Sequence, residues 1–211
     1  MTLRVTDFSH GAPNPRYDDL MSSPSLKLIL ASQSPQRRRL LEESGYQFDV
    51  IVPSAGAEAE IEDLPAPDLV RRLAHCKAAD VAPQIEQGIV IGCDTVVECR
   101  GQVLGKPRNP AHARAMLELL RGHSHHVYSG LCLWRRPDNA IRVEVAITKL
   151  FMEEVSRSEL ERYLSSGDWN GKAGSFGYQD RLGWLRIVHG SESNVVGLPM
   201  ELLEQVLAEL T

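Results

Sequence analysis

The pattern of apolar and polar positions divides the chain into alternating expected strands and helices. The strongest apolar run, GIVIGCDTVVE at residues 88–98, has β-branched and apolar residues on both sides of one aspartate, as expected of a strand buried on both faces. Apolar residues at helical spacing indicate amphipathic helices, most clearly after Pro199. The other expected strands are residues 28–31, 46–52, 103–104, 123–134, 140–151 and 182–189, and the expected helices are 35–44, 68–85, 110–121, 156–164 and 200–210.

Capping residues indicate where several helices begin and end. Ser34 precedes a proline, which is typical of an N-cap followed by a first helical residue, and Gly45 stands just past the end of that helix. Asp68 is expected to cap the next helix. Ser156 and Glu159 have the spacing of a capping box, which predicts another helix start.

The turn between the first strand and the first helix has the composition of an anion-binding site. A helix N-terminus offers unpaired N–H groups and a partial positive charge. Ser32 and Ser34 add hydroxyl donors, and Arg37 and Arg38 add fork-shaped cations suited to phosphate. The turn lacks the G-x-x-x-x-G-K-[ST] pattern of a Walker A loop. We therefore interpret it as a polyphosphate cradle; the alternative is an ordinary capped helix with solvated arginines.

Asp94 is the most informative acidic residue, because a carboxylate inside a buried strand is costly unless it is paired or binds a metal ion. The alternative is an aspartate that caps a loop at a strand end. Thr95 is either an ordinary strand residue or a ligand contact through its hydroxyl. Lys77, on the second expected helix, and Lys106, between a glycine and a proline, either lie on the surface or reach toward phosphate.

A glycine-rich segment at residues 167–179, GDWNGKAGSFGYQ, is a second candidate binding element. Its four glycines allow a ligand to approach the backbone closely. Gln179 offers a donor and an acceptor together, which suits the edge of a nucleobase. The alternative is a tight structural loop whose aromatic residues pack inward. Residues 190–194 are expected to form a turn before the last helix.

Composition and charge limit the classes of partner. The 211 residues include 23 Lys and Arg and 28 Asp and Glu, and the net charge of −5 argues against a general nucleic-acid-binding protein. No apolar run is long enough to span a bilayer. Residues 1–24 are polar with no secretory signal, and we expect a flexible extension followed by a single domain at 25–211. The four cysteines form no CxxC pair, so reduced thiols and a cytoplasmic location are expected.

Acidic residues and cations together indicate a phosphate–metal complex. Glu58 lies in an acidic segment that is either a solvated loop or a source of metal ligands, and Asp94 offers a second carboxylate. Such carboxylates hold a divalent ion while cations neutralise the remaining phosphate charge. No Ser-His-Asp set is evident, so hydrolysis by an activated water is the expected chemistry. We interpret His123, His125 and His126 as loop and strand-edge residues rather than metal ligands.

Six segments give the sequence a resemblance to a known family. In chain order they are LILASQSPQRRRLLEESG, RRLAHCKA, IGCDTVV, GQVLGKP, GKAGSFGYQ and VVGLP, and they cover about residues 26–210. The sequence resembles the Maf family of nucleoside triphosphate pyrophosphatases. The resemblance implies an ITPase-like α/β fold, in an α/β/α arrangement, with an elongated central mixed sheet and two lobes flanking an active-site cleft. It also implies cleavage of the α–β phosphate bond of a nucleotide, with a divalent cation such as Mg²⁺ or Mn²⁺.

Matched position by position, the resemblance also implies roles for individual residues. Asp94 would be the proton acceptor that activates water, close to the metal ion. Glu58 would bind the metal, with Glu60 as a rival because the loop is one residue longer than is usual in the family. Thr95, Gln179 and Gln36 would recognise the base. The phosphate contacts would be Ser32, Arg37, Arg38, Lys77, Lys106 and Lys172.

The resemblance is greatest to the subfamily that acts on dTTP and UTP, at D-T (94–95) and G-Y-Q (177–179). Gln36 fits neither subfamily, because the first usually has arginine there and the subfamily that acts on 7-methyl-GTP has tryptophan. The amide of Gln179 suits a pyrimidine edge, whereas a methylated guanine is cationic and favours a carboxylate. The alternatives are a 7-methyl-GTP or other nucleotide pyrophosphatase, or a nucleotide-binding regulator of cell division. A homodimer is a further expectation, since two-fold pairs are common.

Overall fold

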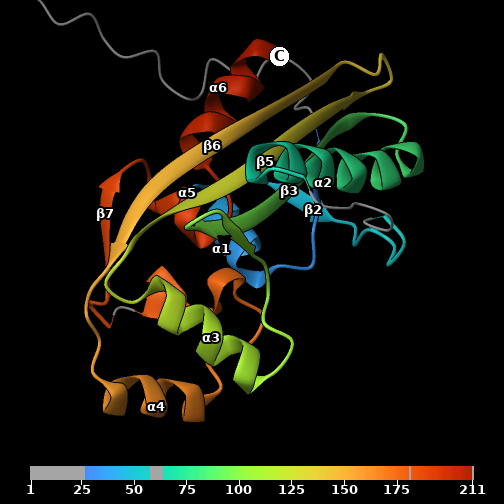
Figure 1. Ribbon diagram of the computed structural model, residues 1–211. Helices are drawn as coiled ribbons and strands as arrows, with labels where there is room; N and C mark the ends of the chain where they lie inside the picture. The colour runs from blue at the N-terminus through green and yellow to red at the C-terminus, as the bar shows by residue number, and fades with distance from the viewer. Residues whose placement is uncertain (1–26, 58–63, 181, 211) are drawn as a thin grey trace, which may run out of the picture.

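The computed structural model describes residues 27–57, 64–180 and 182–210, which form one mixed seven-stranded sheet with helices on both faces (Figure 1). The strand order is β2-β1-β3-β5-β6-β7, with β4 paired to β3 outside this path. The strands β2, β1 and β3 are parallel, and the other pairs are antiparallel. The strands are β1 (Leu28–Ala31), β2 (Phe48–Val50), β3 (Gly88–Cys99), β4 (Gln102–Leu104), β5 (Ser124–Arg136), β6 (Ile141–Met152) and β7 (Leu185–His189). The helices are α1 (Pro35–Glu43), α2 (Ala66–Val81), α3 (Pro110–Leu120), α4 (Arg157–Ser166), α5 (Glu192–Val196) and α6 (Met200–Leu210), with 3-10 turns η2 (Ala82–Gln84), η3 (Ala173–Ser175) and η4 (Tyr178–Asp180).

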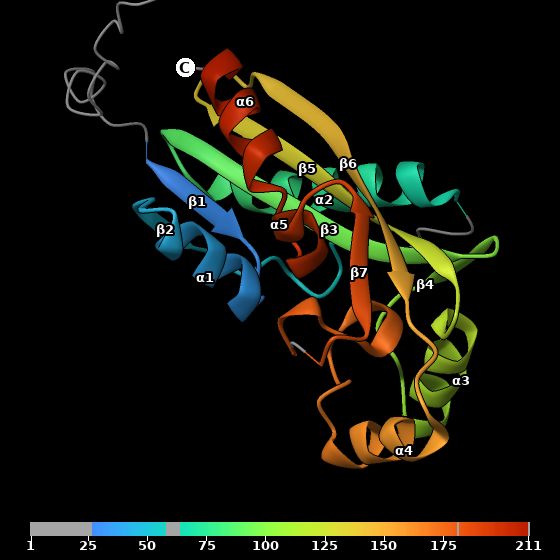
Figure 2. The ribbon, with the colours of Figure 1, turned by 90° about the vertical axis from the view of Figure 1, so that its left-hand side faces the viewer.

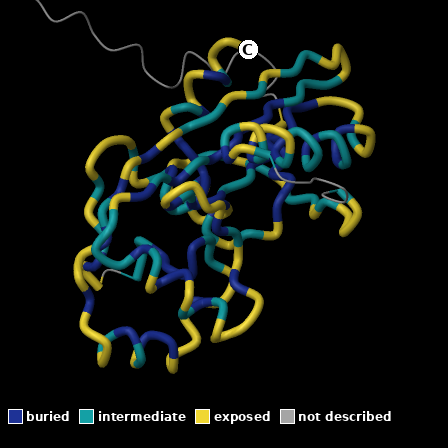
Figure 3. Tube along the Cα trace, viewed as in Figure 1, coloured by how far each residue is buried: buried dark blue, intermediate teal, exposed yellow. Residues whose placement is uncertain are grey.

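The buried strand β1 explains why helices cover both faces of the sheet. Leu28 and Leu30 pack in a cluster with residues of α1 and α6, whereas Ile29 and Ala31 pack with residues of α2. A strand with apolar side chains on both of its faces requires a helical layer on each side. Figure 2 shows α6 in front of the sheet and α2 behind it, and Figure 3 shows buried positions along the central strands. The predicted α/β/α fold is confirmed.

A second lobe has a hydrophobic core of its own. This core is one buried cluster that includes Leu117, Leu150 and Leu160. It is built by α3, α4 and η3 together with the start of β5 and the end of β6. Both views place α3 and α4 away from α1, α2 and α6, so the molecule is elongated (Figures 1 and 2). The predicted two-lobed arrangement is therefore present.

The local capping predictions are confirmed. The Ser34 hydroxyl accepts a hydrogen bond from the Arg37 N–H and caps α1. Gly45 follows that helix with a φ of 78°, the left-handed conformation for which glycine is favoured. The capping box of α4 is formed in both directions by Ser156 and Glu159.

Two predictions, a helix cap and a turn, are wrong, and some other elements are shorter than expected, such as β7 and β2. Asp68 does not cap α2, which begins at Ala66 after Pro65, because prolines fit the first turn of a helix and let it start earlier. Asp68 instead pairs with Arg71 on the helix surface. Residues 190–194 form more than a turn, since Ser191 caps the short helix α5 through the N–H of the residue three positions on.

Two expectations from composition concern the membrane and the thiols. Across the described residues, no helix combines the length and apolar character needed to cross a bilayer. All four cysteines carry free thiols, as predicted.

Two glycines allow α2 to pack closely on the sheet. Gly130 lies directly opposite Asp94 in the β3–β5 ladder, and Gly92 lies two residues before Asp94 on the same face of β3. A Cβ atom at Gly130 would lie less than 3.0 Å from the carbonyl oxygen of Val70 in α2. A Cβ atom at Gly92 would lie within the same distance of the carbonyl oxygen of Ala74. The backbone of α2 therefore rests almost directly on the part of β3 that carries Asp94.

Replacing Gly130 with alanine is expected to lower the free energy of unfolding by about 1–3 kcal/mol, because the α2 backbone must move to admit a methyl group. Urea denaturation followed by circular dichroism measures this change. Gly56→Ala is the matched control, since a Cβ there meets none of the described residues within 4 Å. Equal midpoints for Gly130→Ala and wild type would contradict the close packing of α2.

Candidate active site

A gap beside β3 sets the position of the site. β1 pairs with β3 only as far as Gly92, and β4 begins to pair with it at Val97. In the described part of the chain, residues 93–96 therefore have no strand neighbour on that side. Asp94 and Thr95 lie in this interval, on opposite faces of the strand. The gap lies beyond the carboxyl end of β1, and ligands in open α/β sheets bind outside the carboxyl ends of the strands.

A cleft of about 930 Å³ opens at this gap. Its walls come from the β1–α1 turn, α2, β3, the glycine-rich segment and the α5–α6 connection. This volume suits a ligand of nucleotide size. The predicted site residues that line the cleft are Ser32, Gln36, Arg37, Lys77, Asp94, Thr95, Lys106, Lys172 and Gln179.

One predicted site residue, Arg38, is not brought to the cleft, and two others lie outside the described residues. Arg38 is exposed on α1 and does not line it. Glu58 and Glu60, the predicted metal ligands, lie outside the described residues. Asp94 is therefore the one carboxylate among the cleft-lining residues of the described chain.

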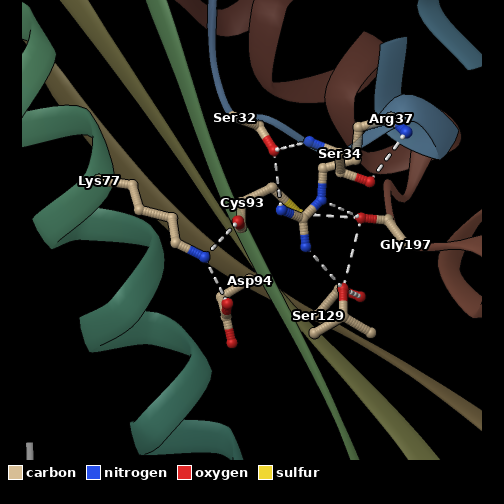
Figure 4. Close-up of polar contacts among 9 residues, drawn as sticks. Ser32, Ser34, Arg37, Lys77, Cys93, Asp94, Ser129 and Gly197 are labelled. Atoms are coloured by element: carbon tan, nitrogen blue, oxygen red, sulfur yellow. Dashed lines mark hydrogen bonds and ion pairs between the residues drawn. The ribbon is translucent and has the colours of Figure 1, made fainter. Parts of the chain in front are cut away.

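Asp94 and Lys77 form a partly buried ion pair between β3 and α2. The Lys77 Nζ lies 2.5 Å from Asp94 Oδ1 and donates a second bond, at 3.4 Å, to the carbonyl of Cys93 (Figure 4). The two side chains are 12% and 15% exposed, so the ion pair is largely removed from water. No donor from the described residues bonds to Asp94 Oδ2. One carboxylate oxygen is held and the other is available to a ligand.

Arg37 is a buried cation that joins three segments on the other face of β3. Its Nε donates to the Gly197 carbonyl at 2.8 Å, and its two terminal nitrogens donate to the hydroxyls of Ser32 and Thr95 at 3.2 and 3.4 Å (Figure 4). All three acceptors are neutral, and within the described chain no carboxylate pairs with Arg37. The side chain is only 9% exposed. A buried guanidinium without a counter-ion is costly, so the site favours an anion.

The turn before α1 is held by hydrogen bonds within itself. Ser32 Oγ accepts from the Ser34 N–H at 3.1 Å, and Ser34 Oγ donates to Gln36 Oε1 at 3.1 Å. This second bond uses the carbonyl oxygen of Gln36 and leaves its NH₂ group for a ligand. The N-terminus of α1 therefore faces the cleft with its donors already oriented.

The glycine-rich segment forms the opposite wall. The Gln179 side chain folds over Gly177, where an added Cβ would lie 2.5 Å from its Nε2. The aromatic rings of Trp169 and Phe176 are buried in the second lobe, as the packed-loop alternative predicts. The segment thus combines both interpretations, because Trp169 and Phe176 pack inward while Lys172 and Gln179 line the cleft.

Sequence reasoning missed two polar groups beside these residues. Asp180 pairs with Lys172 at 2.5 Å, and its position directly after Gln179 was the available signal. Ser129 lies 2.8 Å from the Thr95 hydroxyl on the neighbouring strand, and no local motif marks it.

The described residues offer few metal ligands. They contain no group of three or more His, Cys, Asp or Glu side chains placed to hold a metal ion. Mg²⁺ is commonly held by one or two carboxylates together with substrate phosphates and water, so Asp94 fits a metal that arrives with its nucleotide. His125 also lines the cleft, and its burial lowers its pKa to about 4. His125 is therefore neutral near pH 7.

Comparison with known proteins identifies the family. A family model described as Maf-like protein matches residues 27–210. A dTTP/UTP pyrophosphatase from Rhodopirellula baltica is 47% identical over 199 residues, covering 93% of this chain and 83% of that protein. A second dTTP/UTP pyrophosphatase, from Dictyoglomus thermophilum, is 37% identical and covers 87% of this chain and 96% of its own length. A HAM1 protein from Coxiella burnetii, a solved structure, aligns with a TM-score of 0.48 at 16% identity, covering 87% of this chain and 99% of that one. The sequence match extends over nearly all of the described residues, and the chain belongs to the Maf family.

Proposed function

We propose that the chain hydrolyses the α–β phosphate bond of dTTP and UTP, and of modified pyrimidine nucleotides, to give the monophosphate and pyrophosphate. The observation that carries the proposal is the buried guanidinium of Arg37, which lies at the cleft with only neutral partners in the described chain. Phosphate oxygens match the fork of a guanidinium and supply the missing negative charge. The proposed substrate follows the names of the two relatives above, both dTTP/UTP pyrophosphatases, and the proposed bond follows the resemblance to the family.

Three lysines support a polyphosphate ligand. Lys77, Lys106 and Lys172 line the same cleft from three different segments. A triphosphate carries several negative charges, and further charge develops on the leaving pyrophosphate as the bond breaks. Cations fixed in advance around the phosphates stabilise that charge without reorganising.

Asp94 is the proton acceptor in this proposal. Lys77 holds its Oδ1, and Oδ2 is left to accept a proton from a water molecule. The water oxygen then bonds to the α-phosphorus, the bond from this phosphorus to the bridging oxygen breaks, and the electron pair leaves with pyrophosphate. Lys77 acts here by fixing the orientation of the carboxylate.

A divalent ion, Mg²⁺ or Mn²⁺, would neutralise charge on the phosphate oxygens when it is bound. Asp94 would be one protein ligand, because such hard ions prefer carboxylate oxygens. Glu58 or Glu60 would supply the other. The remaining ligands would be phosphate oxygens and water, which agrees with Asp94 being the one carboxylate that lines the cleft among the described residues.

Base recognition is proposed to involve Gln179, Gln36 and Thr95. The Gln179 amide can pair with a carbonyl and an N–H on a pyrimidine edge. The NH₂ group of Gln36 offers a further donor at the opposite wall. The Thr95 hydroxyl contacts Arg37 and Ser129, so it links the base side of the site to the phosphate side.

Product analysis tests the proposal. The protein is incubated with Mg²⁺ and, separately, UTP, dTTP, CTP, GTP and 7-methyl-GTP, and the products are separated by chromatography. Monophosphate and pyrophosphate from UTP and dTTP are expected. If 7-methyl-GTP alone gave these products, the proposed reaction would hold and the proposed substrate would be wrong. Release of a single phosphate would show that the proposed cleavage position is wrong. Nucleotide binding without any turnover would favour a regulator of cell division.

A further inference from the structure

The carboxylate of Asp180 connects three parts of the second lobe. Its Oδ1 accepts a hydrogen bond from Lys172 Nζ at 2.5 Å. Its Oδ2 accepts from the Tyr163 hydroxyl at 2.8 Å and from the Gly177 N–H at 3.2 Å. The side chains of Lys172 and Asp180 are 16% and 15% exposed, so the ion pair is largely removed from water. These bonds tie the middle and the end of the glycine-rich segment to each other and to α4.

Tyr163 fixes this carboxylate to a rigid part of the fold. Its ring lies 5.1 Å from that of Phe176 and 5.4 Å from that of Trp184, and all three belong to the second-lobe core. Burial and the hydrogen bond to Asp180 raise the pKa of Tyr163, so its hydroxyl stays protonated and donates. The Lys172 Nζ also lies 5.9 Å from the centre of the Tyr163 ring, within the range of a cation–π contact. The anchor of the glycine-rich segment is therefore an ordered aromatic cluster.

Asp180 does not itself line the cleft, but Lys172, which it binds, and Gln179, which precedes it, both do. Lys172 reaches the cleft with one of its three donors held by Asp180, which leaves two for a ligand. Gln179 precedes Asp180 in η4, where the Asp180 N–H donates to the Gly177 carbonyl at 3.0 Å. Holding a lysine in place before the ligand arrives reduces the side-chain entropy lost on binding.

We propose that Asp180 is a positioning residue, which holds Lys172 and Gln179 in their binding orientation and thereby sets affinity for the nucleotide. This inference rests on the proposed function for the identity of the ligand. Asp180 acts through its neighbours, because nothing places its carboxylate in contact with the cleft itself.

The test is a double-mutant cycle on UTP affinity. Asp180→Asn keeps the size of the side chain and removes its charge, and Lys172→Met removes the ammonium. Dissociation constants are measured by calorimetry in the presence of EDTA, where metal-dependent turnover does not interfere. Asp180→Asn is expected to weaken UTP binding about tenfold in the wild-type background, the scale of one hydrogen bond to a charged group. The same change in the Lys172→Met background is expected to have less than a third of that effect.

A purely structural role for Asp180 gives a different pattern. Loss of folded protein lowers the number of binding sites and leaves the dissociation constant unchanged in either background. An unchanged constant, or equal weakening in both backgrounds, would overturn the inference. Asp168→Asn is the matched control, since Asp168 is exposed in the same segment and lies outside the cleft. It is expected to bind UTP like the wild type.

The ratio of UTP to CTP affinity provides an independent readout. Because Gln179 is expected to distinguish the two bases, Asp180→Asn should move this ratio toward one, whereas Tyr163→Phe, which keeps the ion pair, should change it less. Failure of the proposed function is visible separately, as absence of turnover with Mg²⁺ in the wild-type protein. The binding cycle still tests Asp180 in that case.

Discussion

Asp94→Asn is expected to lower kcat for UTP by about 100- to 10,000-fold, the usual range for loss of a general base. Asparagine has nearly the same shape and still offers an oxygen to Lys77, but it cannot take a proton from water. UTP should continue to bind, because Arg37 and the other cations are unchanged. The measurements are the steady-state rate at saturating UTP with Mg²⁺ and the dissociation constant with EDTA.

The control for this prediction is an exposed aspartate that does not line the cleft. Asp49 forms an ion pair with Lys27, and both side chains are more than half exposed, so Asp49→Asn should leave the rate near that of the wild type. If Asp94→Asn retains more than a tenth of the wild-type rate, Asp94 is not the base. If it loses affinity in EDTA as strongly as it loses rate, Asp94 acts in binding the nucleotide rather than as the base.

The elements that the sequence predicts well are those specified by neighbouring residues. The N-cap at Ser34 and the capping box at Ser156 need only a few residues around them, and both are confirmed. The error at Asp68 has the same local origin, because two prolines compete with an acidic cap and shift the helix start. The gap beside β3, by contrast, is not specified by neighbouring residues. It depends on where β1 ends and β4 begins, and no short pattern reports both.

The sequence predicts most of the residues that line the candidate site, but it predicts their arrangement in space only in part. Arg37 and Arg38 are adjacent in sequence, yet Arg37 is buried at the cleft and Arg38 is exposed, since consecutive positions on a helix point in different directions. Asp94 and Thr95 likewise lie on opposite faces of β3, and only the fold shows which helix each face meets. The pairing of Lys77 with Asp94 further depends on the close approach of α2, which Gly92 allows.

Arg37→Gln is expected to lower kcat/KM for UTP by about 100- to 1,000-fold, the scale of one lost donor to developing charge. The free energy of unfolding should change little. Glutamine loses hydrogen bonds to Ser32, Thr95 and Gly197, but it also removes a buried positive charge that lacks a carboxylate partner in the described chain. These two changes oppose each other, so the urea midpoint should move little.

Pyrophosphate separates the binding role of Arg37 from a structural role. A ligand that binds only the folded state raises the melting temperature, and the rise grows with the ratio of ligand concentration to dissociation constant. Wild type should therefore be stabilised by pyrophosphate, and Arg37→Gln should be stabilised far less. Arg39→Gln is the matched control, because Arg39 is 72% exposed and pairs with Glu43 on the surface of α1. Equal stabilisation of all three proteins would mean that the buried guanidinium serves the fold, and the anion site would then have to lie among the lysines.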